Sequence, residues 1–383
     1  MRSVAVVTTS RADYGIYRPI LHAIRLESTL NLRLLVSGSH LSETFGMTVR
    51  EIEAEGFATD ERIEMLLASD SPQATAKSMG LAVAGFAQSF AEHAPDLLVV
   101  LGDRFEMHAA ALASLPFRIP VAHIHGGEVT SGAIDEALRH SLTKLSHLHF
   151  VSTPDHGRRV RQLGEEDWRV TVCGAPALDN VRRLRLSARA EIEQRLGLKL
   201  ADQFLMVTFQ PATLDAASPA DQVSLLLDVI AATGLPAVVT GSNADPGAHG
   251  VRAVIEERAG RDRRLQFVET LGTEMYFSLM ALAAVMVGNS SSGLIEAPSF
   301  RLPVVNVGSR QQGRLRAANV IDVDATRDAI AAGIRRALEP SFARSLAGLE
   351  NPYGDGQAAD RIVARLANVD LGANLLQKRF VDR

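Results

Sequence analysis

The feature that most constrains this chain is a regular alternation of short apolar segments with longer segments of helical periodicity. In the first half the apolar segments lie at residues 3–9, 32–38, 96–102, 120–126 and 148–153, and each ends in Gly, Ser or Thr. Short segments of this kind are typical of strands that are buried on both faces of a parallel sheet. Helical patterns at 16–27, 75–93 and 105–114 separate them. The alternation predicts a doubly wound α/β domain.

The second half repeats the scheme, with apolar segments at 204–211, 236–243, 265–270, 284–291 and 303–308. Helical patterns at 221–233 and 250–259 lie between them, and an arginine-rich segment at 180–202 joins the two halves. A chain of 383 residues is also too long for one compact core. We therefore predict two Rossmann-like α/β domains, residues 1–180 and 181–357, that face a cleft and bind ligand at their strand ends.

The bulk composition excludes several classes of partner. Apolar residues make up 46% and charged residues 22% of the chain, and the formal net charge of −4 argues against nucleic acid and acidic membranes. The single cysteine, Cys173, rules out an intramolecular disulfide and fits a reducing compartment. We expect no signal peptide, because the apolar run at the start of the sequence is short and breaks into polar residues, and no segment has about 18 uninterrupted apolar residues. We expect a soluble, cytoplasmic protein.

Polar side chains cluster directly after the predicted strands of the first domain, where an open α/β sheet brings them to one crevice. One such residue alone is readily explained as a helix cap. Four clusters at four strand ends instead indicate a binding or catalytic site: Ser10, Arg11 and Asp13; Ser39 and His40; Asp103 and Arg104; and the segment 123–128.

Two loops of the second domain favour an anionic ligand. The segment VGNSSSGLIEA, residues 287–297, leads from a strand into a helix that is expected to begin near Gly293. Backbone N–H groups at a helix N-terminus, together with the serine hydroxyls of this segment, bind phosphate readily, and Glu296 is placed to accept from a ribose hydroxyl. Arg310 follows the next strand, and a guanidinium binds phosphate bidentately. The alternatives are a serine-capped helix and a solvated arginine loop.

The stretch HIHGGEVTSGAIDEALRH, residues 123–140, has three interpretations. His123 and His125 alternate on an extended segment and would point to one side, as paired metal ligands do. Neither cysteine ligands nor an HExxH spacing accompanies them, so a metal is the second choice. A helix cap explains Asp135 alone but not its neighbours. We favour a proton-transfer site in which Asp135 enters at the start of a helix.

Seven motifs then occur in order over nearly the whole chain: SRADYG, GSHL, GDRFE, HIHGGEVTSGAIDEALRHSLTKLSH, GNSSSGLIE, GSRQQGR and YGDGQ. Together they resemble the hydrolysing UDP-N-acetylglucosamine 2-epimerases of sialic acid biosynthesis and their legionaminic acid relatives. The resemblance implies a glycosyltransferase-B-like fold in which the C-terminal segment 358–383 packs back on the first domain. It also implies a homodimer or homotetramer that needs no metal and no other cofactor.

The resemblance further implies a reaction, in which UDP-N-acetylglucosamine and water give UDP and free N-acetylmannosamine. UDP would leave by elimination across C1–C2, and water would then add to the 2-acetamidoglucal with the opposite configuration at C2. This chemistry needs carboxylates for proton transfer and for an oxocarbenium-like transition state. It also needs positive charge and N–H donors for the departing diphosphate.

Carried over by position, the resemblance implies two groups of site residues. Asp103 and Asp135 would be catalytic carboxylates, and Arg104 would accompany them. The remaining residues would bind the substrate: Arg11 the diphosphate, His40 the sugar, Ser290, Ser291 and Glu296 the phosphate and ribose, and Arg310 the nucleotide, with Gln210 and Asn243 beside them.

Two positions depart from the family pattern. Some members have a catalytic glutamate where this chain has His125, so proton transfer would move to His125 or to Glu128. Related enzymes place a histidine where this chain has Gln210, and glutamine cannot transfer a proton. Either change favours a different sugar, such as N,N′-diacetylbacillosamine linked to UDP or GDP.

Three other classes stay open on the same residues. A retaining glycosyltransferase would need an acceptor, and a metal-dependent hydrolase would lose activity in chelator. A sugar-nucleotide sensor or assembly scaffold would bind its ligand without releasing product.

Overall fold

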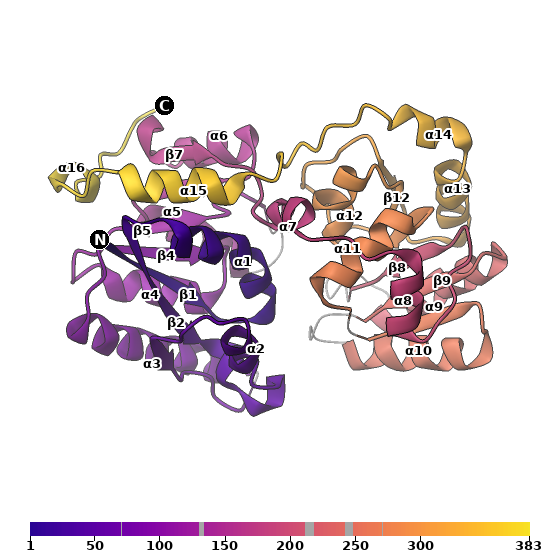
Figure 1. The fold of residues 1–383 in the computed structure, drawn as a ribbon, viewed down its shortest axis with the longest axis horizontal. Helices are drawn as coiled ribbons and strands as arrows, with labels where there is room; N and C mark the ends of the chain where they lie inside the picture. The colour runs from indigo at the N-terminus through magenta and orange to yellow at the C-terminus, as the bar shows by residue number, and fades with distance from the viewer. Residues whose placement is uncertain (70, 130–133, 211–217, 242–247, 270) are drawn as a thin grey trace. The chain divides into compact units, whose positions relative to one another are not determined.

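The computed structural model describes residues 1–69, 71–129, 134–210, 218–241, 248–269 and 271–383. It divides the chain into two compact units (Figure 1). Unit 1 consists of Met1–Asn180 and Tyr353–Arg383, and unit 2 consists of Val181–Pro352. From the sequence, the domain boundaries were predicted to follow residues 180 and 357. In the described part of the chain, no helix combines the length and the apolar character that a membrane span requires.

Unit 1 is built on a seven-stranded parallel sheet in the order β3-β2-β1-β4-β5-β6-β7. The order reverses between β1 and β4, which are neighbours at the centre of the sheet. The strands are β1 (Arg2–Thr8), β2 (Leu30–Ser37), β3 (Glu61–Ile63), β4 (Leu97–Leu101), β5 (Val121–Ile124), β6 (Leu148–Val151) and β7 (Val170–Val172).

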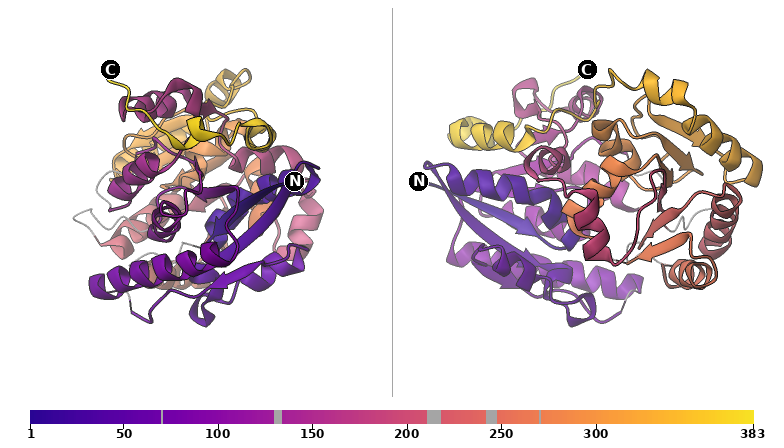
Figure 2. Two further views of the ribbon diagram at one scale, coloured as in Figure 1. Left: turned by 90° about the vertical axis from the view of Figure 1, so that its left-hand side faces the viewer. Right: turned by 45° about the vertical axis from the view of Figure 1, so that its right-hand side comes forward.

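Helices cover both faces of this sheet (Figures 1 and 2). α4 packs between α3 and α5, while α1 packs against α15. Two of these helices begin at a serine whose hydroxyl accepts from a backbone N–H, Ser10 for α1 and Ser71 for α3. The helices are α1 (Arg11–Leu26), α2 (Val49–Ala54), α3 (Pro72–Glu92), α4 (Phe105–Ser114), α5 (Ile134–Leu145), α6 (Pro154–Gln162), α15 (Ala358–Asn368) and α16 (Ala373–Leu376), with α7 (Ala177–Arg183) spanning the boundary with unit 2.

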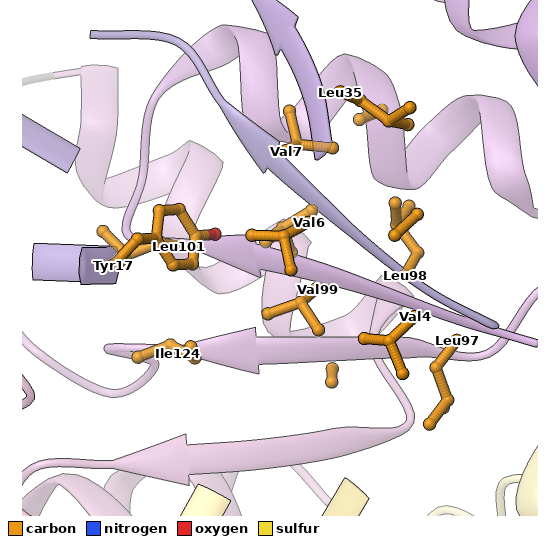
Figure 3. Close-up of a cluster of buried hydrophobic side chains, with 14 of the residues drawn as sticks. Val4, Val6, Val7, Tyr17, Leu35, Leu97, Leu98, Val99, Leu101 and Ile124 are labelled. Atoms are coloured by element: carbon orange, nitrogen blue, oxygen red, sulfur yellow. The ribbon is translucent and has the colours of Figure 1, made fainter. Parts of the chain in front are cut away.

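The central strands of unit 1 are buried on both faces. Residues 4–7 of β1 have no exposed surface, and neither do Leu97, Leu98, Val99 and Val100 of β4. Figure 3 shows side chains of β1, β2, β4 and β5 gathered in one cluster with Tyr17 of α1. Burial on both faces explains why these segments read as continuous apolar runs rather than as an alternation of apolar and polar residues.

Unit 2 is a six-stranded parallel sheet in the order β10-β9-β8-β11-β12-β13. Successive strand residues enter two different cores, since Leu205 and Val207 pack on one face and Met206 on the other. The elements are α8 (Arg189–Leu196), β8 (Leu205–Thr208), α9 (Pro219–Ala232), β9 (Ala237–Thr240), α10 (Ala248–Arg261), β10 (Leu265–Val268), α11 (Gly272–Leu282), β11 (Val285–Gly288), α12 (Ser292–Ile295), β12 (Val304–Val307), β13 (Val320–Val323), α13 (Arg327–Ala337) and α14 (Pro340–Ser345).

The two parallel sheets confirm the predicted α/β class, and each predicted strand coincides with an observed one. Three strands escaped the sequence pattern: β3, β7 and β13. Each is three or four residues long, lies at an edge of its sheet and is partly exposed. The helix expected near Gly293 is also shorter than the pattern implied, because α12 has four residues and a 3-10 turn follows at Ala297–Phe300.

α15 is fixed to unit 1 by a carboxylate from a distant part of the chain. Asp179 is fully buried, and its two oxygens accept from Ala358 N at 2.9 Å and Ala359 N at 2.8 Å. These are N–H groups of the first turn, which have no acceptor within a helix. The apolar face of α15, including Ile362 and Leu366, then enters the core of unit 1.

We predict that Asp179→Ala lowers the free energy of unfolding by about 2 kcal/mol, because two buried N–H groups lose their acceptor. Asp328→Ala is the matched control, since this exposed carboxylate also lies in the first turn of a helix, α13. Its loss should cost about 0.5 kcal/mol. Urea unfolding measures both values, and equal losses in the two variants would contradict the prediction.

Candidate active site

The predicted site residues follow strands on either side of the point where the order of each sheet reverses. In unit 1 this point lies between β1 and β4, and Arg11, Asp103 and Arg104 come shortly after these strands. In unit 2 it lies between β8 and β11, which are followed by Gln210 and Ser290. Open α/β sheets bind ligands at the carboxyl ends of their strands at such a point. Each unit therefore presents one cluster of candidate residues.

Asp13 organises the turn between β1 and α1. Its Oδ2 accepts from Thr9 N at 3.0 Å, Thr9 Oγ1 at 2.7 Å and Ser10 Oγ at 3.0 Å, and Thr8 Oγ1 donates to Oδ1. Burial raises the pKa of Asp13, and the hydrogen bonds and the Arg104 charge offset only part of that effect. The backbone after β1 is thus held from inside by one carboxyl group.

His40 lies behind this turn and is fully buried. Its Nε2 is 3.0 Å from Thr8 Oγ1, and its Nδ1 is 2.6 Å from Thr48 Oγ1. Burial lowers the pKa of His40 to about 4, so the ring is neutral near pH 7. The structure therefore places His40 in contact with the β1 turn through Thr8, with no exposed ring atom.

The two predicted arginines differ in their surroundings. Arg104 precedes α4, and its Nη2 and Nε donate to Glu106 at 2.6 and 3.2 Å. Because Glu106 has no exposed surface, it fixes the guanidinium in place. Arg11 is exposed, and its Nη1 lies 3.7 Å from Glu51 Oε1. A long, exposed ion pair restrains a side chain only weakly, so Arg11 is able to turn toward a ligand.

Arg139 of α5 joins the loops that follow β4 and β5. Its Nη2 is paired with Asp103 Oδ2, and its Nη1 donates to the His125 carbonyl at 2.8 Å. Asp135 lies one turn earlier on the same helix and is half-buried. Burial and then the negative charge of Asp103 raise the pKa of Asp135. The site therefore holds two unlike carboxyl groups, one paired with a cation and one that retains its proton more readily.

His125 and Glu128 form a buried pair after β5. His125 Nδ1 donates to Glu128 Oε1 at 2.5 Å, and Ser152, which follows β6, donates from its Oγ to the same oxygen at 2.9 Å. Burial alone would raise the pKa of Glu128, but His125, Arg139 and His156 together outweigh that effect and hold the pKa below its usual range. His125 Nε2 is buried and has no hydrogen-bond partner among the described residues. An ionised Glu128 thus fixes Nδ1 as a donor and leaves Nε2 as the other reactive position.

The backbone around His125 is constrained. His125 has φ of 65°, a left-handed conformation that non-glycine residues rarely adopt. Gly127 has φ of 74°, and a Cβ atom there would lie 2.3 Å from the His156 carbonyl oxygen. Arg159 of α6 donates from Nη1 to the Gly127 carbonyl. Packing on both sides therefore holds the His125–Glu128 loop in one conformation.

The expectation that His123 and His125 point to the same side is wrong. β5 ends at Ile124, so His125 has left the extended conformation on which the alternation depends. His123 Nε2 donates to the Gly102 carbonyl at 2.7 Å, and burial lowers the pKa of His123 to about 3. Among the described residues, no group of three or more His, Cys, Asp or Glu side chains is arranged to hold a metal ion.

In unit 2 the loops after β8 and β11 are joined by Asn289. Its Oδ1 accepts from Gln210 N at 2.7 Å, and its Nδ2 donates to the Gln210 carbonyl at 2.8 Å. The Asn289 carbonyl accepts from Gln311 Nε2 at 2.8 Å and from Arg310 Nη1 at 3.3 Å. Three loops are thereby brought together, and with them the predicted residues Gln210 and Arg310.

Ser290, Ser291 and Glu296 lie on one short segment with Tyr276 beside it. Ser291 precedes α12, and Glu296 follows it, so Glu296 does not lie inside a longer helix as the pattern implied. The Tyr276 hydroxyl is 3.3 Å from Thr208 Oγ1, and burial raises the pKa of Tyr276. Asn243 lies outside the described residues.

A family model described as UDP-N-acetylglucosamine 2-epimerase matches residues 22–367. An enzyme of Legionella pneumophila named UDP-N,N′-diacetylbacillosamine 2-epimerase (hydrolyzing) is 38% identical over 99% of each chain. This chain belongs to the UDP-N-acetylglucosamine 2-epimerase family. The family that the seven motifs predicted is confirmed, and the chain is a UDP-sugar 2-epimerase.

Two more 2-epimerases complete the comparison. An enzyme of Campylobacter jejuni named GDP/UDP-N,N′-diacetylbacillosamine 2-epimerase (hydrolyzing) is 37% identical over 84% of each chain. The solved structure of UDP-GlcNAc 2-epimerase from Neisseria meningitidis, bound to UDP-GlcNAc, has a TM-score of 0.82 at 20% identity and covers 95% of this chain and 99% of its own. This likeness confirms the glycosyltransferase-B-like α/β fold.

Sequence reasoning missed several side chains of this 2-epimerase's clusters. Arg139, Ser152, Asn289 and Tyr276 each join segments that are far apart in the chain. The position of Arg139 four residues after Asp135 places both on one face of a helix, and this spacing is a usable signal. Nothing in the local sequence marks the other three.

We predict that Gly127→Ala lowers the free energy of unfolding by at least about 2 kcal/mol, since the new Cβ meets a backbone carbonyl and the backbone is left-handed. Gly15→Ala is the matched control, because Gly15 lies inside α1 with open space at its Cβ position. This variant should gain up to about 1 kcal/mol. Thermal unfolding distinguishes the two, and a stable Gly127→Ala protein would refute the account of the loop.

Proposed function

We propose that this 2-epimerase acts on UDP-N,N′-diacetylbacillosamine and releases UDP and the free sugar with inverted configuration at C2. The substrate is supported by identity of 38% and 37% to two relatives named for this sugar, against 29% to the Neisseria meningitidis serogroup B UDP-N-acetylglucosamine 2-epimerase. UDP-N-acetylglucosamine, which the motifs first favoured, is the second candidate because the matching family model carries its name.

The proposed reaction type rests on two unlike carboxyl groups near Arg139, those of Asp103 and Asp135. In the first step a base takes the C2 proton while the C1–O bond breaks, so that UDP leaves and a C1=C2 double bond forms. In the second step water adds to C1, and C2 receives a proton on the opposite face. Two proton-transfer groups are needed because the proton leaves one face of C2 and returns to the other.

Asp103 and Asp135 suit different parts of this sequence. Asp103 is held in place by its ion pair with Arg139, and a carboxylate stabilises an oxocarbenium-like transition state. Burial and the Asp103 charge favour the protonated form of Asp135, which equips this carboxyl group to donate and recover a proton. We assign electrostatic stabilisation to Asp103 and proton transfer to Asp135.

His125 is proposed as the second proton-transfer group, acting through Nε2. Glu128 and Ser152 bind the Nδ1 side of the ring, so Glu128 orients His125 rather than moving a proton itself. This arrangement supplies an imidazole where some family members have a glutamate. It does not need a titratable side chain at position 210.

The nucleotide is proposed to bind through residues of unit 2. Ser290 and Ser291 are placed to bind phosphate, Glu296 to accept from the ribose hydroxyls, and Arg310 to contact the diphosphate. Gln210 and Asn243 remain candidate ligand contacts. In unit 1, Arg104 and the exposed Arg11 are proposed to supply positive charge for a diphosphate.

We predict that the purified protein in deuterated water converts UDP-N,N′-diacetylbacillosamine to UDP and a free sugar that carries deuterium at C2. Proton NMR follows UDP release, the C2 proton and the C2 configuration in one experiment. UDP-N-acetylglucosamine and GDP-N,N′-diacetylbacillosamine are the comparison donors, and each should react at least tenfold more slowly. Faster turnover of UDP-N-acetylglucosamine would overturn the proposed sugar, and retention of the C2 proton would overturn the proposed elimination.

We predict that Asp103→Asn, Asp135→Asn and His125→Gln each lower kcat by about 10²–10⁴-fold while the protein stays folded. Glu128→Gln should cost less than His125→Gln, because it removes only the group that orients the ring. Glu136→Gln is the matched control on α5 and should retain activity within about twofold, as its partner is the partly exposed His140 at 3.2 Å. Wild-type turnover in Asp103→Asn or Asp135→Asn would contradict the catalytic role assigned to that residue.

A further inference from the structure

A second buried charge cluster surrounds Glu165 in unit 1. Glu165 has no exposed surface, and its carboxylate accepts from Lys144 Nζ at 2.6 Å and from Lys378 Nζ at 2.8 Å. His149 Nε2 lies 3.0 Å away. Burial alone would raise the pKa of Glu165, but His149 and the two lysines lower it to about 2. The cluster therefore contains one carboxylate between two ammonium groups.

Lys378 also caps the C-terminal end of α5. Its Nζ lies 2.6 Å from the Ser146 carbonyl oxygen, 2.9 Å from that of Lys144 and 3.4 Å from that of Thr143. The last carbonyls of a helix have no partner within it, and a cation there also interacts favourably with the helix dipole. A side chain from the end of the chain thus completes the helix that carries Asp135 and Arg139.

The segment that carries Lys378 is itself fixed at several points. We call residues 373–381 the C-terminal strap. The buried Arg169 donates to the carbonyls of Asn374 and Leu375 at 2.8 Å each, and to His147, between α5 and β6, at 3.2 Å. Val381 N donates to the Gly164 carbonyl at 3.0 Å. Since its own ends are held, the strap supplies a rigid anchor for Lys378.

We propose that Lys378 is a positioning residue that holds α5 in the register required for proton transfer by Asp135. α5 has 12 residues and is thus about 18 Å long, so it transmits a shift at its capped end to its first turn. The proposal depends on the role proposed for Asp135, but not on which sugar the enzyme takes. Displacement of a catalytic group by about 1 Å can cost as much as 100-fold in rate.

The test compares Lys378→Met with Arg383→Met on the same tail. Arg383 is the matched control because its ion pair among the described residues is with Asp167, a largely exposed carboxylate, at 2.9 Å. With whichever donor the wild-type enzyme turns over, and at a temperature where all variants are fully folded, Lys378→Met should lower kcat about tenfold or more with KM within about twofold. Arg383→Met should leave both unchanged. An unchanged kcat in Lys378→Met would mean that Lys378 only stabilises the fold, and would overturn the proposal.

A chemical rescue separates the ammonium group from the rest of the side chain. Lys378→Cys should be as slow as Lys378→Met, and alkylation with 2-bromoethylamine then installs an ammonium group on a thioether stem of lysine length. Cys173, the other thiol, is buried and its pKa is raised to about 12, so it reacts slowly. Recovery of most of kcat is expected, and no recovery after complete alkylation would count against a positioning role.

A readout without substrate distinguishes this proposal from the proposed function. Hydrogen exchange at the amides of α5 should accelerate at both ends of the helix in Lys378→Met and stay as in wild type in Arg383→Met. If the wild-type protein turns over no donor, the proposed function fails while this exchange measurement still decides whether the strap fixes α5. Faster exchange confined to residues 143–146 would overturn the transmission along the helix.

Discussion

The ion pair between Arg139 and Asp103 is the interaction on which the unit 1 site depends. A buried guanidinium needs an anion, and here it takes the carboxylate that follows β4 and the His125 carbonyl that follows β5. One side chain of α5 therefore sets the spacing of two neighbouring loops at the carboxyl ends of β4 and β5. The two carboxyl groups differ chemically, because Asp103 is paired with Arg139, whereas burial and the negative charge of Asp103 raise the pKa of Asp135. Removal of Arg139 would be expected to disturb geometry and proton affinity together.

Unit 2 joins its loops through an uncharged side chain, that of Asn289. The Asn289 side chain both accepts from and donates to the backbone of Gln210, and its own carbonyl collects Gln311 and Arg310. A neutral amide suits a place where an anionic nucleotide is proposed to bind, since a carboxylate would repel it and a fixed cation would pair with protein groups instead. In both units, loops are joined at the point where the strand order reverses. Unit 1 uses an ion pair for this junction, and unit 2 uses a neutral amide.

Whether an element or a site residue could be predicted from the sequence depends on where it lies in the fold. Central strands such as β4 are buried on both faces and read as unbroken apolar runs, whereas the edge strands β3, β7 and β13 are short, half-exposed and invisible to the pattern. The positions of Asp103 after a strand and of Asp135 at the start of a helix were predictable from the local sequence pattern. The burial of His40 and the turn of the backbone at His125 were not, since His40 contacts Thr8 and His125 N donates to the Phe150 carbonyl, each more than 20 residues away in the chain.

The position of Asp135 in the first turn of α5 places it under opposing influences. Burial and Asp103 raise its pKa, while the positive end of the helix dipole, Arg104 and Arg139 lower it. A proton-transfer group works best when its pKa lies close to the working pH, and for a carboxyl group this requires the effects that raise the pKa to prevail, as they do at Asp135. The dipole acts on Asp135 only if the first turn of α5 is well formed, and the far end of the helix is held by Lys378 and Ser146. The order of the helix therefore affects the proton affinity of Asp135.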